Sequence, residues 1–175
     1  TIIIFGGPNY PLDNKGQKEF LQAHPEIDFY IFREGEFAFL GLFNKLKELN
    51  FDVSKLREKG YKIPNTHYLT GGSIVQGDLL PQLKELDEIP SPYLSGLCDN
   101  LLAQKFIPIM ETKRGCPFKC TFCESGDDHY NRIYSFSFER AKEEISYLAK
   151  NNNCPVLQMT DLNFGMYKDD IELCK

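Results

Sequence analysis

Three cysteines crowd into one short segment of the sequence, which reads RGCPFKCTFC. Cys116, Cys120 and Cys123 have the spacing C-x3-C-x2-C, so one loop can present three thiolates to the same face of a metal centre. A closed zinc site takes four ligands, and a plain electron-transfer 4Fe-4S cluster normally takes four cysteines. The next cysteine along the chain is Cys154, far from this loop in the sequence. The spacing therefore indicates three thiolate ligands and leaves the fourth position to something else.

Two interpretations of this segment remain open. In the first, His129, which follows Cys123 by six residues, completes a structural zinc site in a non-enzymatic interaction module. In the second, the cysteines hold a 4Fe-4S cluster whose fourth iron is free for a small ligand. Structural zinc ligands usually come as two separated pairs, so the spacing favours the cluster. Disulfides are disfavoured because the cysteines are clustered and the N-terminus lacks a signal-peptide pattern.

The segment is similar to the signature of radical SAM enzymes, in which an aromatic residue precedes the last cysteine. RGCPFKCTFC is close to the form found in members that also carry a cobalamin-binding domain. The resemblance implies that Cys116, Cys120 and Cys123 bind three irons of a 4Fe-4S cluster, and that the fourth iron chelates S-adenosylmethionine. It also implies that Phe122 lies against the adenine. The expected chemistry is reductive cleavage to methionine and a 5′-deoxyadenosyl radical, with a donor such as flavodoxin or ferredoxin.

A second motif follows in the stretch TDLNFG, which starts at Thr160. Many radical SAM enzymes have a Gly-Gly-Glu stretch here that holds the methionine amino group, whereas this chain is similar to the D-x-N-F form of the cobalamin-linked members. The resemblance implies that Asp161 or Asn163 takes over that hydrogen bonding. No residue is assigned a catalytic role from the sequence.

The N-terminal half resembles the closing part of a cobalamin-binding Rossmann-like domain. The strand TIIIF ends in Gly6 and Gly7. The resemblance implies that these glycines let the backbone approach the nucleotide tail of cobalamin, since close approach needs residues without a Cβ. The stretch REGE is similar to the family's G-E-G-E, with Arg33 in place of the first glycine. The expected cofactors are therefore a 4Fe-4S cluster, S-adenosylmethionine and cobalamin.

Hydrophobic patterns predict the elements that position these motifs. Residues 1–5 and 27–32 are β-branched and aromatic runs, typical of buried strands in a parallel sheet. Residues 15–23 are expected to be helical, and residues 36–50 form an amphipathic helix. The order strand, helix, strand, helix therefore predicts half of a doubly wound α/β domain. The apolar face of the second helix contains Phe39, Leu42, Phe43, Leu46 and Leu49.

The regular pattern is lost between residues 51 and 104. Gly71 and Gly72 separate two short apolar runs and predict a hairpin, because glycine accepts a positive φ at both central positions of a tight turn. The later stretch IPSPY is too rich in proline for a helix or a central strand. We therefore interpret residues 51–104 as an interdomain linker with a short hairpin.

A second α/β unit is predicted over residues 105–175. Residues 106–111 and 155–160 are expected strands, and Ser137 is placed to cap an amphipathic helix between them. This order describes a βαβ unit, and the cysteine loop leaves the carboxyl end of its first strand, where α/β folds put their ligands. The pattern therefore predicts a functional site at the cysteines.

These predictions combine into one α/β organisation. Residues 1–50 would be the C-terminal part of a cobalamin-binding Rossmann-like domain, residues 51–104 the linker, and residues 105–175 the first βαβ portion of a truncated radical SAM (βα) barrel. The chain is therefore expected to be an internal fragment of a longer protein. The hypothesis is a radical SAM enzyme that performs methyl transfer or rearrangement at an unactivated carbon. A methylthiotransferase-like enzyme without cobalamin is an alternative, although the other cysteines lack the grouping of an auxiliary cluster.

The composition of the chain disfavours nucleic acids and membranes as binding partners. The 175-residue chain has a formal net charge of −5 and a pI near 5.3, which gives no electrostatic footprint for nucleic acid or an anionic membrane. No apolar run approaches the roughly 20 residues that span a bilayer. We expect a cytoplasmic enzyme with a small-molecule substrate. Lys113, Arg114 and Lys119 are expected to place positive charge around the cysteine loop, or to be solvated surface charges.

Overall fold

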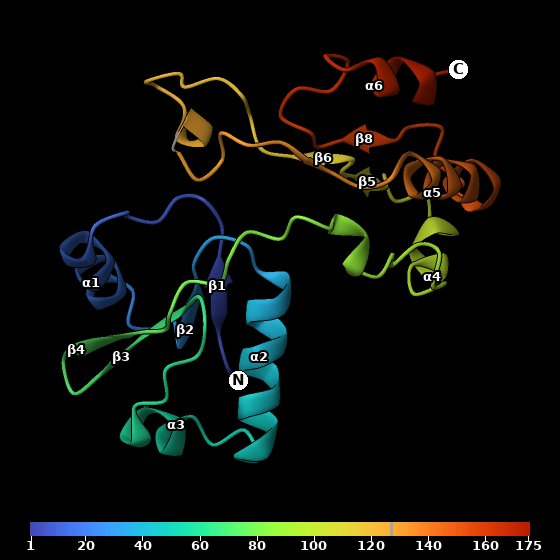
Figure 1. Cartoon of the computed structure of the whole chain (residues 1–175). Helices are drawn as coiled ribbons and strands as arrows, with labels where there is room; N and C mark the ends of the chain where they lie inside the picture. The colour runs from blue at the N-terminus through green and yellow to red at the C-terminus, as the bar shows by residue number, and fades with distance from the viewer. Residues whose placement is uncertain (127) are drawn as a thin grey trace. The chain divides into compact units, whose positions relative to one another are not determined.

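The computed structural model describes residues 1–126 and 128–175, and it divides into two compact units, Thr1–Gln82 and Leu83–Lys175. Figure 1 shows helices and strands in both units, so the predicted α/β class is confirmed. In the described part of the chain, no helix combines the length and apolar character that crossing a membrane requires.

The first unit is built on a four-stranded sheet of order β1-β2-β3-β4. Its strands are β1 (Ile4–Gly6), β2 (Phe29–Ile31), β3 (Thr66–Thr70) and β4 (Ser73–Gln76). β1 and β2 are parallel, as the two buried runs predicted, whereas β3 and β4 are antiparallel to their neighbours. The sheet is therefore mixed.

Three helices accompany this sheet: α1 (Asn14–Ala23), α2 (Glu36–Glu48) and α3 (Val53–Lys59). α1 begins after Asp13, whose carboxylate accepts a hydrogen bond from the backbone N–H of Gly16 at 2.9 Å. α1 and α2 lie on opposite sides of β1 in Figure 1. The predicted helices at residues 15–23 and 36–50 are confirmed.

Side-chain alternation along β2 explains how both faces of the sheet are buried. Phe29 and Ile31 point to one core with residues of α2, α3 and β3. Tyr30 and the following Phe32 point to the other, which also contains Tyr10, Leu21 and Ile27. The second core is largely aromatic, and the rings of Tyr10 and Tyr30 stack with centroids 3.8 Å apart.

The buried face of α2 differs from the predicted one. Its buried residues are Ala38, Leu42 and Leu46, which follow one another at four-residue spacing. Phe39 and Phe43 are about half exposed, and their rings stack with centroids 6.4 Å apart. The aromatic side chains lie beside the buried stripe because each comes one residue after a position that faces the sheet.

The predicted hairpin is confirmed, and its place in the fold differs from the linker interpretation. Gly71 and Gly72 have φ values of 53° and 76° in the turn between β3 and β4. β3 pairs with β2, with His67 opposite Tyr30, so the hairpin is part of the first unit's sheet. The first unit therefore extends well beyond residue 50, and only the segment after it lies outside that sheet.

The second unit contains the predicted strand–helix–strand order. β5 (Ile109–Met110) and β8 (Gln158–Met159) are parallel, and α5 (Phe138–Asn151) connects them. The hydroxyl of Ser137 accepts a hydrogen bond from the backbone N–H of Arg140 at 3.2 Å, so the predicted cap is confirmed. This is a βαβ unit with short strands.

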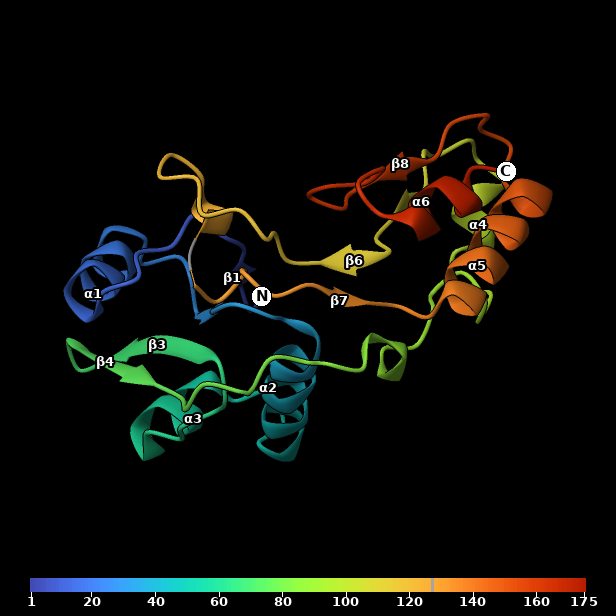
Figure 2. The same cartoon turned by 45° about the horizontal axis from the view of Figure 1, so that its top comes forward.

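A two-stranded ribbon brackets the cysteine loop in the same unit. β6 (Lys113–Arg114) pairs antiparallel with β7 (Tyr134–Ser135), as Figure 2 shows. The remaining helical segments are short: 3-10 turns at Leu86–Glu88 and Glu124–Gly126, α4 (Asp99–Leu102) and α6 (Lys168–Leu173). The cysteine loop is thus closed at its base by regular hydrogen bonding.

Candidate functional site

The base of the cysteine loop is fixed by one backbone contact and one glycine. The backbone N–H of Cys116 donates to the carbonyl oxygen of Tyr130 at 2.7 Å, next to the β6–β7 ribbon. Gly115 has a φ of 98°, and a Cβ built on it would lie 2.0 Å from the carbonyl oxygen of Arg132. A side chain at this position would clash with backbone, so the ribbon reaches Cys116 only because residue 115 is glycine.

The other two cysteines lie in consecutive tight turns. The N–H of Cys123 donates to the carbonyl oxygen of Cys120 at 3.0 Å, and the N–H of Gly126 donates to that of Cys123 at 2.9 Å. A Cβ at Gly126 would lie 2.5 Å from the carbonyl oxygen of Cys120. The loop is therefore wound back on itself over residues 120–126, and the close approach of its two ends requires a glycine.

The three thiols are chemically suited to iron. Cys116 is half-buried, Cys120 and Cys123 are exposed, and all three are free. Among the described residues, no three or more Cys, His, Asp or Glu side chains are gathered closely enough to hold a metal ion. The structure thus keeps the donors on one loop without converging their sulfur atoms, and it does not bring His129 to them as a fourth ligand. Three soft thiolates on one loop are the kind of ligand that an iron–sulfur cluster takes.

The positive side chains near the loop are engaged in ion pairs. Arg114 Nε lies 2.7 Å from an oxygen of Glu111. Lys119 pairs with the exposed Asp128 and holds the pKa of that carboxyl below its usual range. The excess positive charge expected around the cysteines is therefore compensated locally by carboxylates.

Lys113 forms a more enclosed pair with Asp170. The side chain of Asp170 is 0% exposed, and it accepts hydrogen bonds from Lys113 and from the backbone N–H groups of Gly165 and Tyr167, both at 3.0 Å. Burial raises the pKa of Asp170, but the ammonium and the N–H donors outweigh it and leave the pKa below its usual value. The pair links the start of the cysteine loop to the first turn of α6.

A second link joins the same two parts of the chain. The backbone N–H of Thr112 donates to Asp161 at 2.6 Å, and the Thr112 hydroxyl donates to the other carboxylate oxygen. Thr112 follows β5 and Asp161 follows β8, so both residues lie at the carboxyl ends of the two parallel strands. The carboxylate of Asp161 is thus already occupied by protein donors.

The other two residues predicted to contact S-adenosylmethionine, Asn163 and Phe122, have side-chain groups without a hydrogen-bonding or packing partner among the described residues that occupies them. Asn163 is half-buried, and its Nδ2 is buried without a hydrogen-bond partner in the described structure. Phe122 is 91% exposed, so its ring is available to pack against a ligand. An orphaned amide donor close in sequence to Asp161 and an exposed aromatic ring in the cysteine loop are compatible with a bound nucleoside and amino acid.

Gly6 and Gly7 line a cavity of about 380 Å³ in the first unit, at the carboxyl ends of β1 and β2. Gly7 has a φ of 114°, and no atom lies within 4 Å of the position a Cβ would take. The hydroxyl of Tyr30 donates to the carbonyl oxygen of Gly7 at 2.9 Å and so holds the turn in place. The predicted cobalamin glycines therefore do border an open space, at the end of the sheet where α/β folds bind ligands.

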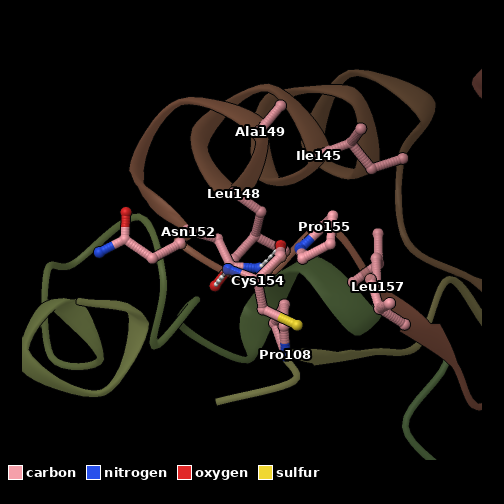
Figure 3. Close-up of a pocket in the computed structure, with 10 residues that line it drawn as sticks. Pro108, Ile145, Leu148, Ala149, Asn152, Cys154, Pro155 and Leu157 are labelled. Atoms are coloured by element: carbon pink, nitrogen blue, oxygen red, sulfur yellow. Dashed lines mark hydrogen bonds between the residues drawn. The ribbon is translucent and has the colours of Figure 1, made fainter. Parts of the chain in front are cut away.

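A cavity of about 420 Å³ lies within the second unit, at the opposite end of the parallel strands from Thr112 and Asp161. It is lined by apolar residues of α5 and of the segment before β8, with Pro108 and Cys154, as Figure 3 shows. Pro108 precedes β5, so the cavity lies at the amino ends of the parallel strands, whereas Thr112 and Asp161 lie at their carboxyl ends. Its size alone does not make it the functional site.

Thr112 and Asp170 are not predicted from the sequence as functional residues. Both are buried polar residues that hold the segments on either side of the predicted ligand region. Asp170 lies in the first turn of α6, where an acidic residue is ordinary, and Thr112 follows an expected strand. Neither position carries a local signal, because their importance comes from partners 49 and 57 residues away.

Comparison with known proteins extends these observations. No protein-family model matches the chain. A 2-(S-pantetheinyl)-carbapenam-3-carboxylate methyltransferase from Streptantibioticus cattleyicolor is 31% identical over 180 residues, covering 99% of this chain and 25% of that enzyme. The cobalamin-dependent radical SAM methyltransferase TokK from Streptomyces tokunonensis is 31% identical over 179 residues, with the same coverage. The chain spans about a quarter of the length of these two relatives.

Solved structures share the fold. OxsB, a cobalamin-dependent S-adenosylmethionine radical enzyme with aqua-cobalamin and S-adenosylmethionine bound, matches with a TM-score of 0.60 and 22% identity, over 93% of this chain and 21% of its own. TsrM from Kitasatospora setae, a radical S-adenosylmethionine methyltransferase with cobalamin and a 4Fe-4S cluster bound, matches with a TM-score of 0.55 and 18% identity, over 98% and 33%. The resemblance to cobalamin-linked radical SAM enzymes inferred from the sequence is thus confirmed.

Proposed function

We propose that this chain, a homologue of cobalamin-dependent radical SAM methyltransferases, is part of an enzyme that cleaves S-adenosylmethionine reductively and transfers a methyl group to an unactivated carbon. The observation that carries the proposal is the loop of three free thiols, which leaves the carboxyl end of β5 beside β8. Three thiolates on one loop leave one iron of a 4Fe-4S cluster for a ligand from outside the protein.

The residues of the chain have distinct roles in this proposal. Cys116, Cys120 and Cys123 hold the cluster, and Gly115 and Gly126 give their loop its shape. When bound, the cluster supplies the electron that cleaves S-adenosylmethionine to methionine and a 5′-deoxyadenosyl radical. The protein binds the ligand, orients it and excludes water from it.

We assign the contacts to S-adenosylmethionine to the side chains that are not already engaged by other described groups of the protein. Phe122 offers an exposed ring for the adenine, and the Asn163 side chain offers a polar group for the amino acid part. Asp161, which accepts two hydrogen bonds from Thr112, instead holds this segment against the end of β5. Of the two residues suggested by the sequence, Asn163 is therefore the better candidate for ligand binding.

Cobalamin is assigned to the first unit, at the cavity bordered by Gly6 and Gly7. The open space beside Gly7 and the absence of a Cβ allow a large ligand to approach the backbone. Methylated cobalamin would supply the methyl group, a small molecule would accept it, and flavodoxin or ferredoxin would supply electrons. Residues 1–82 then correspond to the end of a Rossmann-like cobalamin domain and residues 83–175 to the start of a radical SAM barrel.

Two alternatives differ in what they bind. A methylthiotransferase-like enzyme would lack cobalamin, and the similarity to the cobalamin-dependent methyltransferase TokK favours the cobalamin-dependent reaction. A zinc module would bind the metal through His129 and the cysteines and would contain no iron–sulfur cluster. Binding of both an iron–sulfur cluster and a corrinoid to the chain would separate the three proposals, because only the first requires both.

Anaerobic reconstitution of the full chain with iron and sulfide tests the cluster. We expect a broad absorbance band near about 400 nm that is lost in Cys120→Ala, because the cluster needs all three thiolates. Cys174→Ala is the matched control, since this exposed cysteine lies outside the loop and its removal should leave the band unchanged. Stoichiometric zinc with no such band would contradict the proposal and favour the zinc module.

A further inference from the structure

The cavity beside Gly6 and Gly7 contains an unusual cation. Arg33 lines it, and among the described residues that do so it alone carries a charged side chain. Its backbone has a φ of 68°, a left-handed conformation that costs a non-glycine residue about 1 kcal/mol or more. Strain of this kind persists where the surrounding structure or a function requires that residue.

The guanidinium of Arg33 is only partly satisfied. Its carbon lies 5.1 Å from the centroid of the Phe32 ring, and its Nε is buried without a hydrogen-bond partner in the described structure. A buried donor on a planar cation is costly to leave unsatisfied, and an anionic ligand would remove that cost.

A second feature that favours anions borders the same cavity. Gly35, the N-cap residue of the 13-residue helix α2, lines it and has no side chain with which to cap the helix. The first N–H groups of a helix lack intrahelical partners and carry a partial positive charge, which makes them a site for phosphate. Phe39, one turn further along α2, also lines the cavity and offers an apolar wall. Glu34 and Glu36 flank the helix start without lining the cavity.

We propose that Arg33 and the N-terminus of α2 bind a phosphate group of the ligand that occupies the Gly6–Gly7 cavity. This inference rests on the proposed function, in which that ligand is cobalamin, because the nucleotide tail of cobalamin contains a phosphodiester. The guanidinium fork and the N–H groups at the N-terminus of α2 donate to the phosphate oxygens, while the glycines leave room for the nucleotide tail. The arginine in place of a glycine would thus be a specificity residue for the phosphate.

Three corrinoids and one variant test this assignment on the full chain. Aquacobalamin has the phosphate and the base, cobinamide phosphate has the phosphate alone, and cobinamide has neither. Arg33→Gly removes the cation at a position whose φ suits glycine, so the fold should be retained. We expect Arg33→Gly to weaken aquacobalamin and cobinamide phosphate about tenfold and to leave cobinamide unchanged.

Two further variants check that charge is responsible. Arg33→Lys keeps the charge without the planar fork and should lose only part of the affinity. Lys47→Gln, at an exposed position on α2, removes the same charge elsewhere in the unit and should bind like the wild type. Equal binding of aquacobalamin by the wild type and Arg33→Gly would overturn the inference, as would a loss seen for cobinamide. Failure of the wild type to bind any corrinoid would instead overturn the proposed cobalamin function, and this inference with it.

Discussion

Thr112 and Asp161 join the carboxyl ends of the two parallel strands of the second unit through a paired hydrogen bond from one backbone N–H and one hydroxyl. The contact spans 49 positions in the sequence. It fixes the segment that begins the cysteine loop against the segment that contains Asn163. Two parts of the chain with proposed ligand contacts are therefore held together by residues that are not themselves proposed to touch the ligand.

Asp161 and Asn163 should respond differently to substitution. Asp161→Ala leaves the buried Thr112 donors without their acceptor, so the free energy of unfolding should fall by about 1–3 kcal/mol. Asn163→Ala removes a group whose Nδ2 has no partner, so stability should change by less than about 0.5 kcal/mol while S-adenosylmethionine affinity falls about tenfold. Urea unfolding and equilibrium binding of S-adenosylmethionine to the reconstituted chain measure the two effects. The reverse pattern would assign the ligand contact to Asp161.

The Lys113–Asp170 pair should be worth far more than the exposed ion pairs. Asp170→Ala leaves the nearly buried Lys113 ammonium uncompensated, which costs about 3–5 kcal/mol. Glu172→Ala, which breaks the exposed Lys175–Glu172 pair, is the matched control and should cost less than about 1 kcal/mol. Urea unfolding of the two variants measures both values. Similar effects would mean that Lys113 reaches water when Asp170 is removed.

The same pair predicts a pH dependence with a definite sign. The pKa of Asp170 is lower in the folded chain than its ordinary value of 3.8, so the folded state binds its proton more weakly than the unfolded state. Its stabilising contribution is complete above the ordinary pKa and is lost as the pH falls through the folded-state pKa. Unfolding free energies below pH 4 should therefore decline less steeply in Asp170→Asn than in the wild type.

The local motifs could be predicted from the sequence because they are properties of short segments. The C-x3-C-x2-C spacing, the glycine pair between β3 and β4, and the Ser137 cap each depend on a few consecutive residues. The pairing of β3 with β2 could not be predicted in this way, because the alternation of apolar and polar residues in a strand does not determine which other strand it pairs with. This is why residues 51–82 read as a linker although they complete a sheet.

The contacts around the candidate site could not be predicted either, because they also join residues that are far apart in the sequence. Many carboxylates are available in a chain with 25 acidic residues, and the sequence does not say which of them meets Lys113. The exposed Phe39 and Phe43 illustrate a different limit. A helix with apolar residues over more than half its circumference fixes its buried face only when the shape of the sheet is known.

His67 provides a pH test confined to the first unit. Burial lowers its pKa from 6.5 to about 4, so the folded state stays neutral where the unfolded state is already protonated. The unfolding free energy should therefore fall by about 3 kcal/mol between pH 6.5 and pH 4. His67→Gln cannot titrate and should lose this decline, whereas His24→Gln, at an exposed site, should keep it. Parallel curves for the wild type and His67→Gln would contradict the assignment.

The last prediction concerns the glycines that shape the cysteine loop. Gly115→Ala places a Cβ 2.0 Å from the carbonyl oxygen of Arg132 at a φ of 98°, so the base of the loop must open. Because Cys116 would then move away from the turns that contain Cys120 and Cys123, we expect iron bound after reconstitution to fall by at least about half. Gly126→Ala, with its Cβ 2.5 Å from the carbonyl oxygen of Cys120, should have the same effect.

A control within the same chain separates loop geometry from a general effect of replacing glycine. Gly41 lies inside α2, and the atom nearest to a Cβ there, in Ile63, is 4.0 Å away. Gly41→Ala should therefore raise stability by up to about 1 kcal/mol through helix propensity and leave iron binding unchanged. If Gly115→Ala bound as much iron as Gly41→Ala, the loop would tolerate an open base, and the cysteines alone would determine cluster binding.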